Sequence, residues 1–130
     1  MIGIDTNILV RFFAQDDLLQ AQVAESFLAK LKPESQGFIS LVTLAEFTWV
    51  LRTKCGLAKT MIISCLEHLL DSPELVVEAQ EIVAEALGTY SRSRAQFADC
   101  LIERSGCFAG CAETVTFDKD ASRFAGMRLL

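Results

Sequence analysis

Hydrophobic and polar residues alternate along the chain in segments that predict strands and helices in turn. Short apolar runs predict strands at residues 2–4, 37–41, 74–78, 114–118 and 127–130. Apolar positions recurring every three or four residues predict helices at 6–12, 16–31, 43–56, 58–72, 79–90 and 95–111, with one or two helical turns at 121–126. Strands that alternate with helices favour an α/β fold with a parallel sheet covered on both faces.

Several polar residues stand where helices are expected to begin or end. Asp17, followed by Gln20, is a candidate cap for the second helix, and Thr43 with Glu46 in "TLAE" matches a capping box. Gly56 is placed to end the helix that follows the second strand. Asp5, at the junction of the first strand and helix, also has an explanation as a cap.

Composition narrows the class of protein. The chain has 130 residues, of which 52% are hydrophobic and 22% charged, and this predicts one globular domain over residues 1–130. A net charge of −5 argues against a general nucleic-acid coat protein, although a cluster of acids in a nuclease would itself contribute negative charge. No membrane span or basic leader is evident, so a cytoplasmic location is expected.

The cysteines do not form a metal-binding pattern. There are five, and none shows the C-x-x-C spacing of a zinc knuckle. Cys100, Cys107 and Cys111 fall at helical spacing, which predicts that they line one buried face as small apolar residues.

Acidic residues recur near the ends of the predicted strands. Asp5 ends the first strand, Asp118 ends the fourth, and Glu46 follows the second; Asp99 lies among small and apolar neighbours early in its helix. Carboxyl ends of parallel strands share one edge of a sheet, where ligands bind. Two carboxylates 4 Å apart repel by roughly 4 kcal/mol at an effective dielectric near 20. A divalent cation between the carboxylates would replace this repulsion by a net attraction, and carboxylate oxygens suit Mg²⁺ or Mn²⁺.

Four segments occur in a recognisable order along nearly the whole chain: "GIDTNILVR", "SLVTLAEF", "FADCLI" and "VTFDKD". In this set the chain resembles a PIN domain, and within that superfamily a VapC-type toxin ribonuclease. The resemblance implies a three-layer α/β/α fold with a central, mainly parallel sheet of about five strands.

The resemblance also assigns roles to particular residues. It implies catalytic roles for Asp5, Glu46, Asp99 and Asp118, with Asp5, Asp99 and Asp118 as ligands of Mg²⁺ or Mn²⁺. The accessory residues would be Asp120, Thr6, Asn7 and Thr116. Asp5 would then be a metal ligand and helix capping would pass to Thr6 or Asn7, while Asp120 has an alternative role as the cap of the last helix. Glu103 is an additional acid where relatives often have a small residue, and it either joins the site or faces solvent.

The chemistry implied is hydrolysis of an RNA phosphodiester by water activated on the bound ion. Thr6 or Thr116 would orient the water or an acid by hydrogen bonding. Single-stranded or loop RNA is expected as substrate because the cleaved bond must be exposed. Arg11, Arg92 and Arg94 are candidate phosphate contacts, with ordinary solvated surface as their alternative role.

The sequence does not assign a single role to Trp49 or to His68. Trp49 is a candidate for stacking on a base, but its helical spacing favours the core or an interface. His68, the single histidine, lies mid-helix and is interpreted as structural or exposed.

Partners follow from the resemblance as well. VapC-type toxins form homodimers and are held inactive by a small antitoxin protein, so both partners are expected here. The alternatives are an RNA-processing nuclease without a toxin role and an inactive PIN module that binds RNA or protein. An aspartyl-phosphate hydrolase is disfavoured because Asn7 stands where its second aspartate belongs, and a receiver domain because Glu78 follows the third strand.

Overall fold

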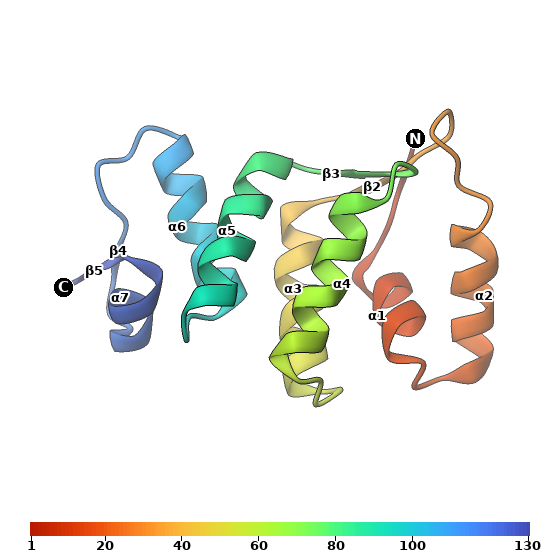
Figure 1. Cartoon of the computed structure of the whole chain (residues 1–130), viewed down its shortest axis with the longest axis horizontal. Coiled ribbons are helices and arrows are strands. Elements are labelled where there is room, and N and C mark those ends of the chain that lie inside the picture. Colours follow the sequence, from red (N-terminus) through yellow and green to blue (C-terminus); the bar gives the residue numbers. More distant parts are fainter. The chain divides into compact units, whose positions relative to one another are not determined.

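A computed structural model describes all 130 residues, which form seven helices and five short strands (Figure 1). The chain divides into two compact units, residues 1–78 and 79–130, and each is described by itself. Unit 1 contains β1 (Ile2–Gly3), α1 (Thr6–Ala14), α2 (Leu18–Leu28), β2 (Gly37–Ile39), α3 (Leu41–Thr53), α4 (Lys59–Asp71) and β3 (Leu75–Val77). Unit 2 contains α5 (Gln80–Arg92), α6 (Phe97–Phe108), β4 (Val115–Thr116), α7 (Lys119–Ala125) and β5 (Arg128–Leu129).

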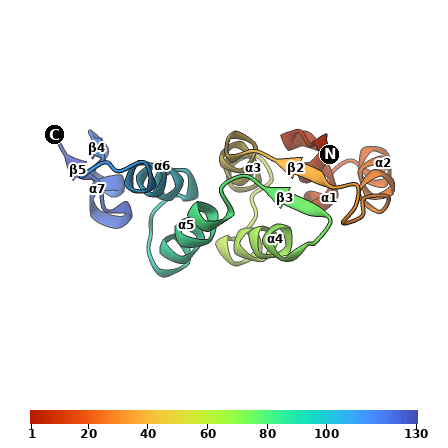
Figure 2. The same cartoon turned by 90° about the horizontal axis from the view of Figure 1, so that it is seen from above.

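All strand pairs are parallel, which confirms the expected α/β class. In unit 1 the order is β1-β2-β3, with Ile2 opposite Gly37 and Phe38 opposite Val76. Figure 2 shows β2 and β3 side by side, and α4 contacts β3. In unit 2, β4 pairs with β5. The expected single sheet of about five strands is instead found as a three-stranded sheet in unit 1 and a two-stranded sheet in unit 2.

Close packing around β2 depends on one glycine. A Cβ atom at Gly37 would lie 2.5 Å from Cδ1 of Ile4 and 3.0 Å from Cδ1 of Leu31. Ile4 is buried, and its amide donates to Phe38 O over 2.9 Å. The absence of a side chain at position 37 therefore lets the chain pass closely beside Ile4, the residue that precedes Asp5.

The core of unit 1 lies where the strands meet α1, α3 and α4. Its most buried side chains include Leu9, Ile39, Phe47 and Ile62. Phe47 is 0% exposed, and full burial of such a side chain stabilises a fold by about 1.5–3 kcal/mol. It faces the Phe13 ring, with ring centroids 5.6 Å apart. This packing fixes α3, which carries Glu46, against α1, which begins after Asp5.

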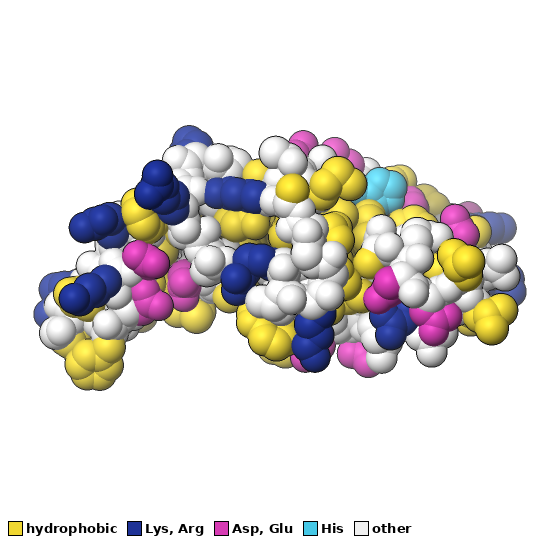
Figure 3. Space-filling model, turned by 90° about the horizontal axis from the view of Figure 1, so that it is seen from below, with side chains coloured by type: hydrophobic (Ala, Val, Ile, Leu, Met, Phe, Trp, Pro, Cys, Tyr) yellow, Lys and Arg dark blue, Asp and Glu magenta, His cyan; other side chains and the backbone are white.

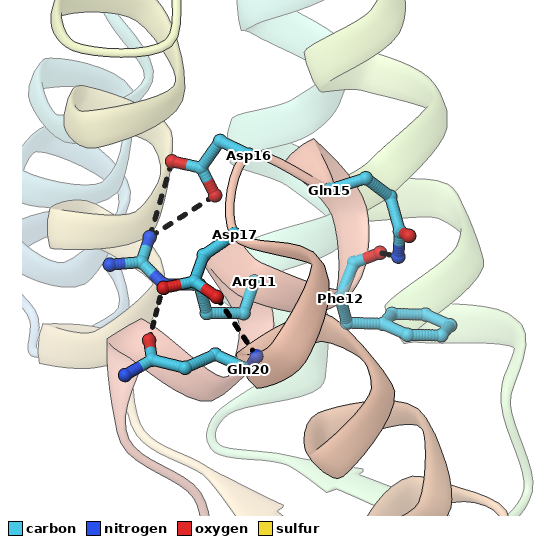
Figure 4. Close-up of polar contacts among 6 residues, drawn as sticks. All are labelled: Arg11, Phe12, Gln15, Asp16, Asp17 and Gln20. Carbon is cyan, nitrogen blue, oxygen red and sulfur yellow. Dashed lines mark hydrogen bonds and ion pairs between the residues drawn. The ribbon is translucent and has the colours of Figure 1, made fainter.

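The helix starts in unit 1 confirm one prediction and correct two. Asp17 caps α2 by accepting from the Gln20 amide at 3.0 Å, as expected (Figure 4). Ser40, not Thr43, caps α3, because the helix begins three residues earlier than the capping box implied. Asp5 itself caps α1, so the expectation that capping passes to Thr6 or Asn7 was wrong.

Unit 2 is built on the packing of α5 against α6. The Tyr90 and Phe97 rings meet edge to face, with centroids 5.7 Å apart, and both side chains are buried. Helix α5 continues to Arg92, through part of the polar segment expected to end it.

Helix α6 is shorter than predicted. It ends at Phe108, and Gly110 adopts a φ of +93° while its amide donates to Cys107 O and the Cys111 amide to Gly106 O. This is the left-handed C-terminal motif that favours glycine. Cys100 is buried as expected, but Cys107 in the last turn of α6 and Cys111 beyond its end are exposed, so the prediction of one buried cysteine face was wrong.

The helices differ in how much apolar surface they hide. None of the seven combines the length and apolar character needed to cross a membrane. On α2, three large apolar side chains remain mostly exposed: Leu18, Leu19 and Val23.

Candidate functional site

In unit 1, the structure brings Asp5 and Glu46 to one cavity of about 490 Å³. Asp5 reaches it from the turn between β1 and α1, and Glu46 from the second turn of α3. Because β1 and β2 are parallel, the segments that leave their carboxyl ends begin at the same edge of the sheet. This confirms the expected rim placement for these two acids. Thr6 and Asn7 also line the cavity; Thr6 is buried and Asn7 exposed.

Asp5 keeps coordinating capacity in spite of its capping role. Its Oδ1 accepts the Thr6 amide at 2.8 Å, and Oδ2 accepts no hydrogen bond. Glu46 is exposed and accepts none. With Ser40 as the cap of α3, Glu46 also has no capping-box role. Both side chains are therefore able to bind a cation or a donor that enters the cavity.

Arg11 lies on the same cavity but is held by neighbouring side chains. Figure 4 shows its guanidinium between Asp16 and Gln20. Nη1 donates to both Asp16 oxygens at 3.2 Å, and Nε donates to Gln20 Oε1 at 2.6 Å. These contacts join the end of α1 to the start of α2. A phosphate that binds Arg11 would have to share or replace these hydrogen bonds. The main role of Arg11 is therefore to hold α1 and α2 together.

In unit 2, Asp99 and Asp118 lie close enough to interact electrostatically. Asp99 is half-buried in the first turn of α6. Burial, and secondly the charge of Asp118, raises the pKa of the Asp99 carboxyl above its ordinary value. Neither oxygen of Asp99 accepts a hydrogen bond, and no cation forms an ion pair with it. A partly buried carboxylate is costly without a partner, and the ionisable neighbour of Asp99 is another acid, Asp118.

Asp118 is held firmly by its backbone surroundings. Its Oδ1 accepts the amides of Asp120 at 2.7 Å and Ala121 at 3.0 Å, which makes it the cap of α7. Its own amide donates to Thr116 Oγ1 at 3.0 Å. Thr116 thus positions an acid by hydrogen bonding. Asp120 is in the first turn of α7 and is not its cap, contrary to the alternative considered for it.

The remaining charged candidates of unit 2 have different surroundings. Both carboxylate oxygens of Glu103 accept from the Arg104 guanidinium, whose Nη1 also donates to Glu85 at 3.1 Å. Glu103 therefore neither faces solvent freely nor has an oxygen free of hydrogen bonds. Arg92 folds back over Gly88, and Arg94 lies exposed between α5 and α6. Neither of these two arginines forms an ion pair, so both are available to phosphate.

The donor chemistry suits a hard divalent cation, and the acids are arranged in pairs. Carboxylate oxygens that accept no hydrogen bond are present on Asp5, Glu46, Asp99 and Asp118. Within neither unit do three or more His, Cys, Asp or Glu side chains group as a metal site. Each unit by itself therefore supplies two acids toward such an ion.

The unit 1 cavity contains Lys54, which the sequence did not single out, and Trp49, which it offered as a candidate for stacking on a base. Lys54 and Trp49 both line it, and Lys54 Nζ lies 5.6 Å from the centroid of the Trp49 ring. Trp49 is 50% exposed, which excludes the core among the roles considered for it and leaves an interface or base stacking. Their signal in the sequence was the helical spacing from Glu46, because positions three and eight residues later lie on nearby parts of a helix surface.

On the face drawn in Figure 3, Lys and Arg side chains are interspersed with Asp and Glu. This agrees with the net charge of −5. Contacts with a polyanion would thus depend on individual cations near the acids.

Comparison with known proteins identifies a family. A family model for the PIN domain matches residues 2–127, a span that includes every acid described above. No curated protein and no solved structure matches the chain. PIN domains are generally nuclease modules that use divalent metal ions, so the match supports a hydrolase acting on nucleic acid.

Proposed function

This chain belongs to the PIN domain family, and on that premise we propose that it is a metal-dependent endoribonuclease, the toxin of a toxin–antitoxin pair. The observation that carries the nuclease proposal is the family match itself, which spans residues 2–127. Residues 1–130 are proposed to act as one PIN domain in the cytoplasm, on single-stranded or loop RNA.

The proposed catalytic residues are Asp5, Glu46, Asp99 and Asp118. Asp5, Asp99 and Asp118 would be ligands of Mg²⁺ or Mn²⁺, which when bound supplies Lewis acidity to water and to the phosphoryl oxygens. The raised pKa of Asp99 supports this assignment, because burial and a neighbouring acid disfavour its charged form until a cation is present. Carboxylates in such surroundings are candidates for functional sites.

The accessory residues would hold the acids in place. Thr116 Oγ1 fixes the backbone at Asp118, and the two amides on Asp118 Oδ1 hold its carboxylate while Oδ2 accepts no hydrogen bond. Thr6 supplies the amide that holds Asp5 Oδ1. Asn7 and Asp120 lie next to these positions and are proposed to contact substrate or ion. Arg92 and Arg94 are proposed phosphate contacts, with Arg11 in a lesser role.

Protein partners are part of the proposal. Leu18, Leu19 and Val23 of α2 are 70–78% exposed, and adjacent apolar side chains on a surface are typical of protein interfaces. These residues support binding of an antitoxin or a second copy of the chain. Arrest of cell growth on expression of the wild type, but not of Asp5→Asn, would be the expected result for a toxin.

The test is cleavage of a mixed set of structured RNAs, such as tRNAs, by the purified chain with Mg²⁺, with Mn²⁺ and with chelator. Asp5→Asn and Asp99→Asn are each expected to lower the cleavage rate by at least about 100-fold, since even outer-shell changes at metal sites cost 10- to 100-fold. Asp71→Asn, an exposed acid at the end of α4, is the matched control and should retain full activity.

Circular dichroism would establish that each variant is folded. Equal cleavage by wild type and both site variants, or cleavage unaffected by chelator, would contradict the proposal. Failure of the folded wild type to cut any RNA would favour a binding module.

A further inference from the structure

Trp49 is an exposed aromatic residue at the unit 1 cavity. It lies on α3 one turn after Glu46, and both side chains line the cavity that also contains Asp5. Half of its surface is exposed, although the large apolar residues around it in sequence, Phe47 and Leu51, are 0% exposed. An indole left open beside two carboxylates is available to a planar ligand.

Lys54 gives this indole an adjacent positive charge. Its Nζ lies 5.6 Å from the ring centroid, within the range of a cation–π contact. It forms no ion pair with any carboxylate. Arg11, the other cation of the cavity, is engaged by Asp16 and Gln20. Lys54 is therefore the cation of the cavity whose charge is not already matched.

An aromatic face beside an unmatched cation suits an unpaired nucleotide. Single-stranded nucleic acids are bound by stacking of bases on aromatic rings, together with basic residues that contact the backbone. Bases within a duplex already stack on one another, so the indole discriminates in favour of unpaired bases. The negative charges of Asp5 and Glu46 repel an anionic ligand, and a neighbouring cation such as Lys54 reduces that repulsion.

We propose that Trp49 and Lys54 form a nucleotide-binding subsite beside Asp5 and Glu46, in which the indole stacks on an unpaired base and the lysine ammonium contacts the adjacent phosphate. The subsite sets the preference for single-stranded RNA and holds the strand at the acids. The inference rests on the proposed ribonuclease function but concerns binding, so it is tested without cleavage.

Trp49 is the single tryptophan of the chain and is its own reporter. In the presence of chelator, titration with an unstructured RNA decamer is expected to quench its fluorescence to saturation. The same decamer annealed to its complement should quench much less at equal concentration. A fluorescence maximum that shifts with protein concentration and does not respond to RNA would overturn the inference, because Trp49 would then belong to a contact between copies of the chain.

Variants separate stacking from charge, using anisotropy of a labelled decamer. Trp49→Ala is expected to weaken binding about 10-fold, and Trp49→Phe less, since a ring remains. Lys54→Gln should weaken binding and reduce the slope of log affinity against log salt by about one. Phe108→Ala removes a similarly exposed aromatic side chain from α6 and should bind as the wild type does.

Equal affinity of wild type and Trp49→Ala would overturn the subsite, whatever the activity of the acid variants. Loss of cleavage in Asp5→Asn with normal decamer binding by Trp49→Ala would leave the ribonuclease proposal intact and reject the subsite. Selective quenching by unpaired RNA, with no cleavage under any metal, would support the subsite and reject the ribonuclease.

Discussion

The two pairs of acids have opposite electrostatic surroundings. In unit 1, Asp5 and Glu46 are exposed and share a cavity with Arg11 and Lys54. In unit 2, Asp99 is half-buried beside Asp118, no cation pairs with either acid, and the pKa of Asp99 is raised by burial and by that neighbour.

This difference in surroundings indicates which pair of acids would bind a cation more favourably. Charges near cations or in water are already stabilised, whereas a partly desolvated carboxylate beside another acid is not. The pair in unit 2 therefore has more to gain from a divalent ion than the pair in unit 1. The two units also differ in how their acids are held, and this leads to measurable consequences.

The largest effect on stability is expected from removal of the caps. Asp118 accepts two amides and Asp5 one. Asp118→Ala should lower the free energy of unfolding by about 1–2 kcal/mol, and Asp5→Ala by about 0.5 kcal/mol. Urea unfolding in the presence of chelator measures both. Asp118→Asn, which keeps a capping oxygen, is the control and should lose only a few tenths of a kcal/mol. Equal losses for the two alanine variants would contradict the comparison.

A smaller effect of opposite sign is expected at the start of α5. Ala79 is the residue before the helix, has a φ of +48°, and makes no side-chain capping bond. Ala79→Gly should raise the free energy of unfolding by about 0.5–1 kcal/mol, since glycine adopts this conformation freely and is a better cap than alanine.

Gln15 provides a matched position in unit 1 for the same measurement. Its φ is +54°, but its side chain donates to Phe12 O at 2.7 Å. Gln15→Gly loses that bond while relieving the same strain, so its net change should be near zero. A larger gain at position 15 than at position 79 would show that the hydrogen bond contributes nothing.

Ionisation of Asp99 should destabilise the folded chain when no metal ion is bound. The raised pKa of Asp99 means that the folded state binds its proton more tightly than the unfolded state does. Stability in chelator should therefore fall as pH rises from about the ordinary value of 3.8 through the raised value. Above that window Asp99→Asn should melt at a higher temperature than the wild type, and the difference should vanish at lower pH. A lower melting temperature for the variant at pH 7 in chelator would contradict this.

The strand and helix order was predictable because periodicity reports directly which face of an element is buried. Helix starts were less predictable: in "SLVT" both Ser40 and Thr43 can cap, and only packing decides that α3 begins after Ser40. Gly110 is a signal in the sequence for the end of α6, but the helical spacing of the cysteines predicted a helix that continues past it. For Trp49 the sequence could not decide between burial and exposure, because the residue borders the apolar stripe formed by Phe47 and Leu51.

The sequence predicted which residues belong to the candidate site, but not how buried each one is or which side chains lie beside it. Asp5 and Asp118 follow strands, which is a pattern in the sequence, and Asp5 and Glu46 do share a cavity. Sequence spacing carries no information on desolvation, so the raised pKa of Asp99 and the nearness of Asp118 required coordinates. The engagement of Arg11 by Asp16 and Gln20 likewise depends on how α1 turns into α2.

The glycine at position 37 has a consequence for how the sequence tolerates change. Gly3, in the neighbouring strand, has open space where a Cβ would lie, whereas any side chain at position 37 would displace Ile4, which directly precedes Asp5. In a library of all single substitutions, position 3 should accept small residues more readily than position 37 does. A genetic selection for loss of activity would accordingly return mutations in codon 37, although glycine there contributes no chemical group to the reaction.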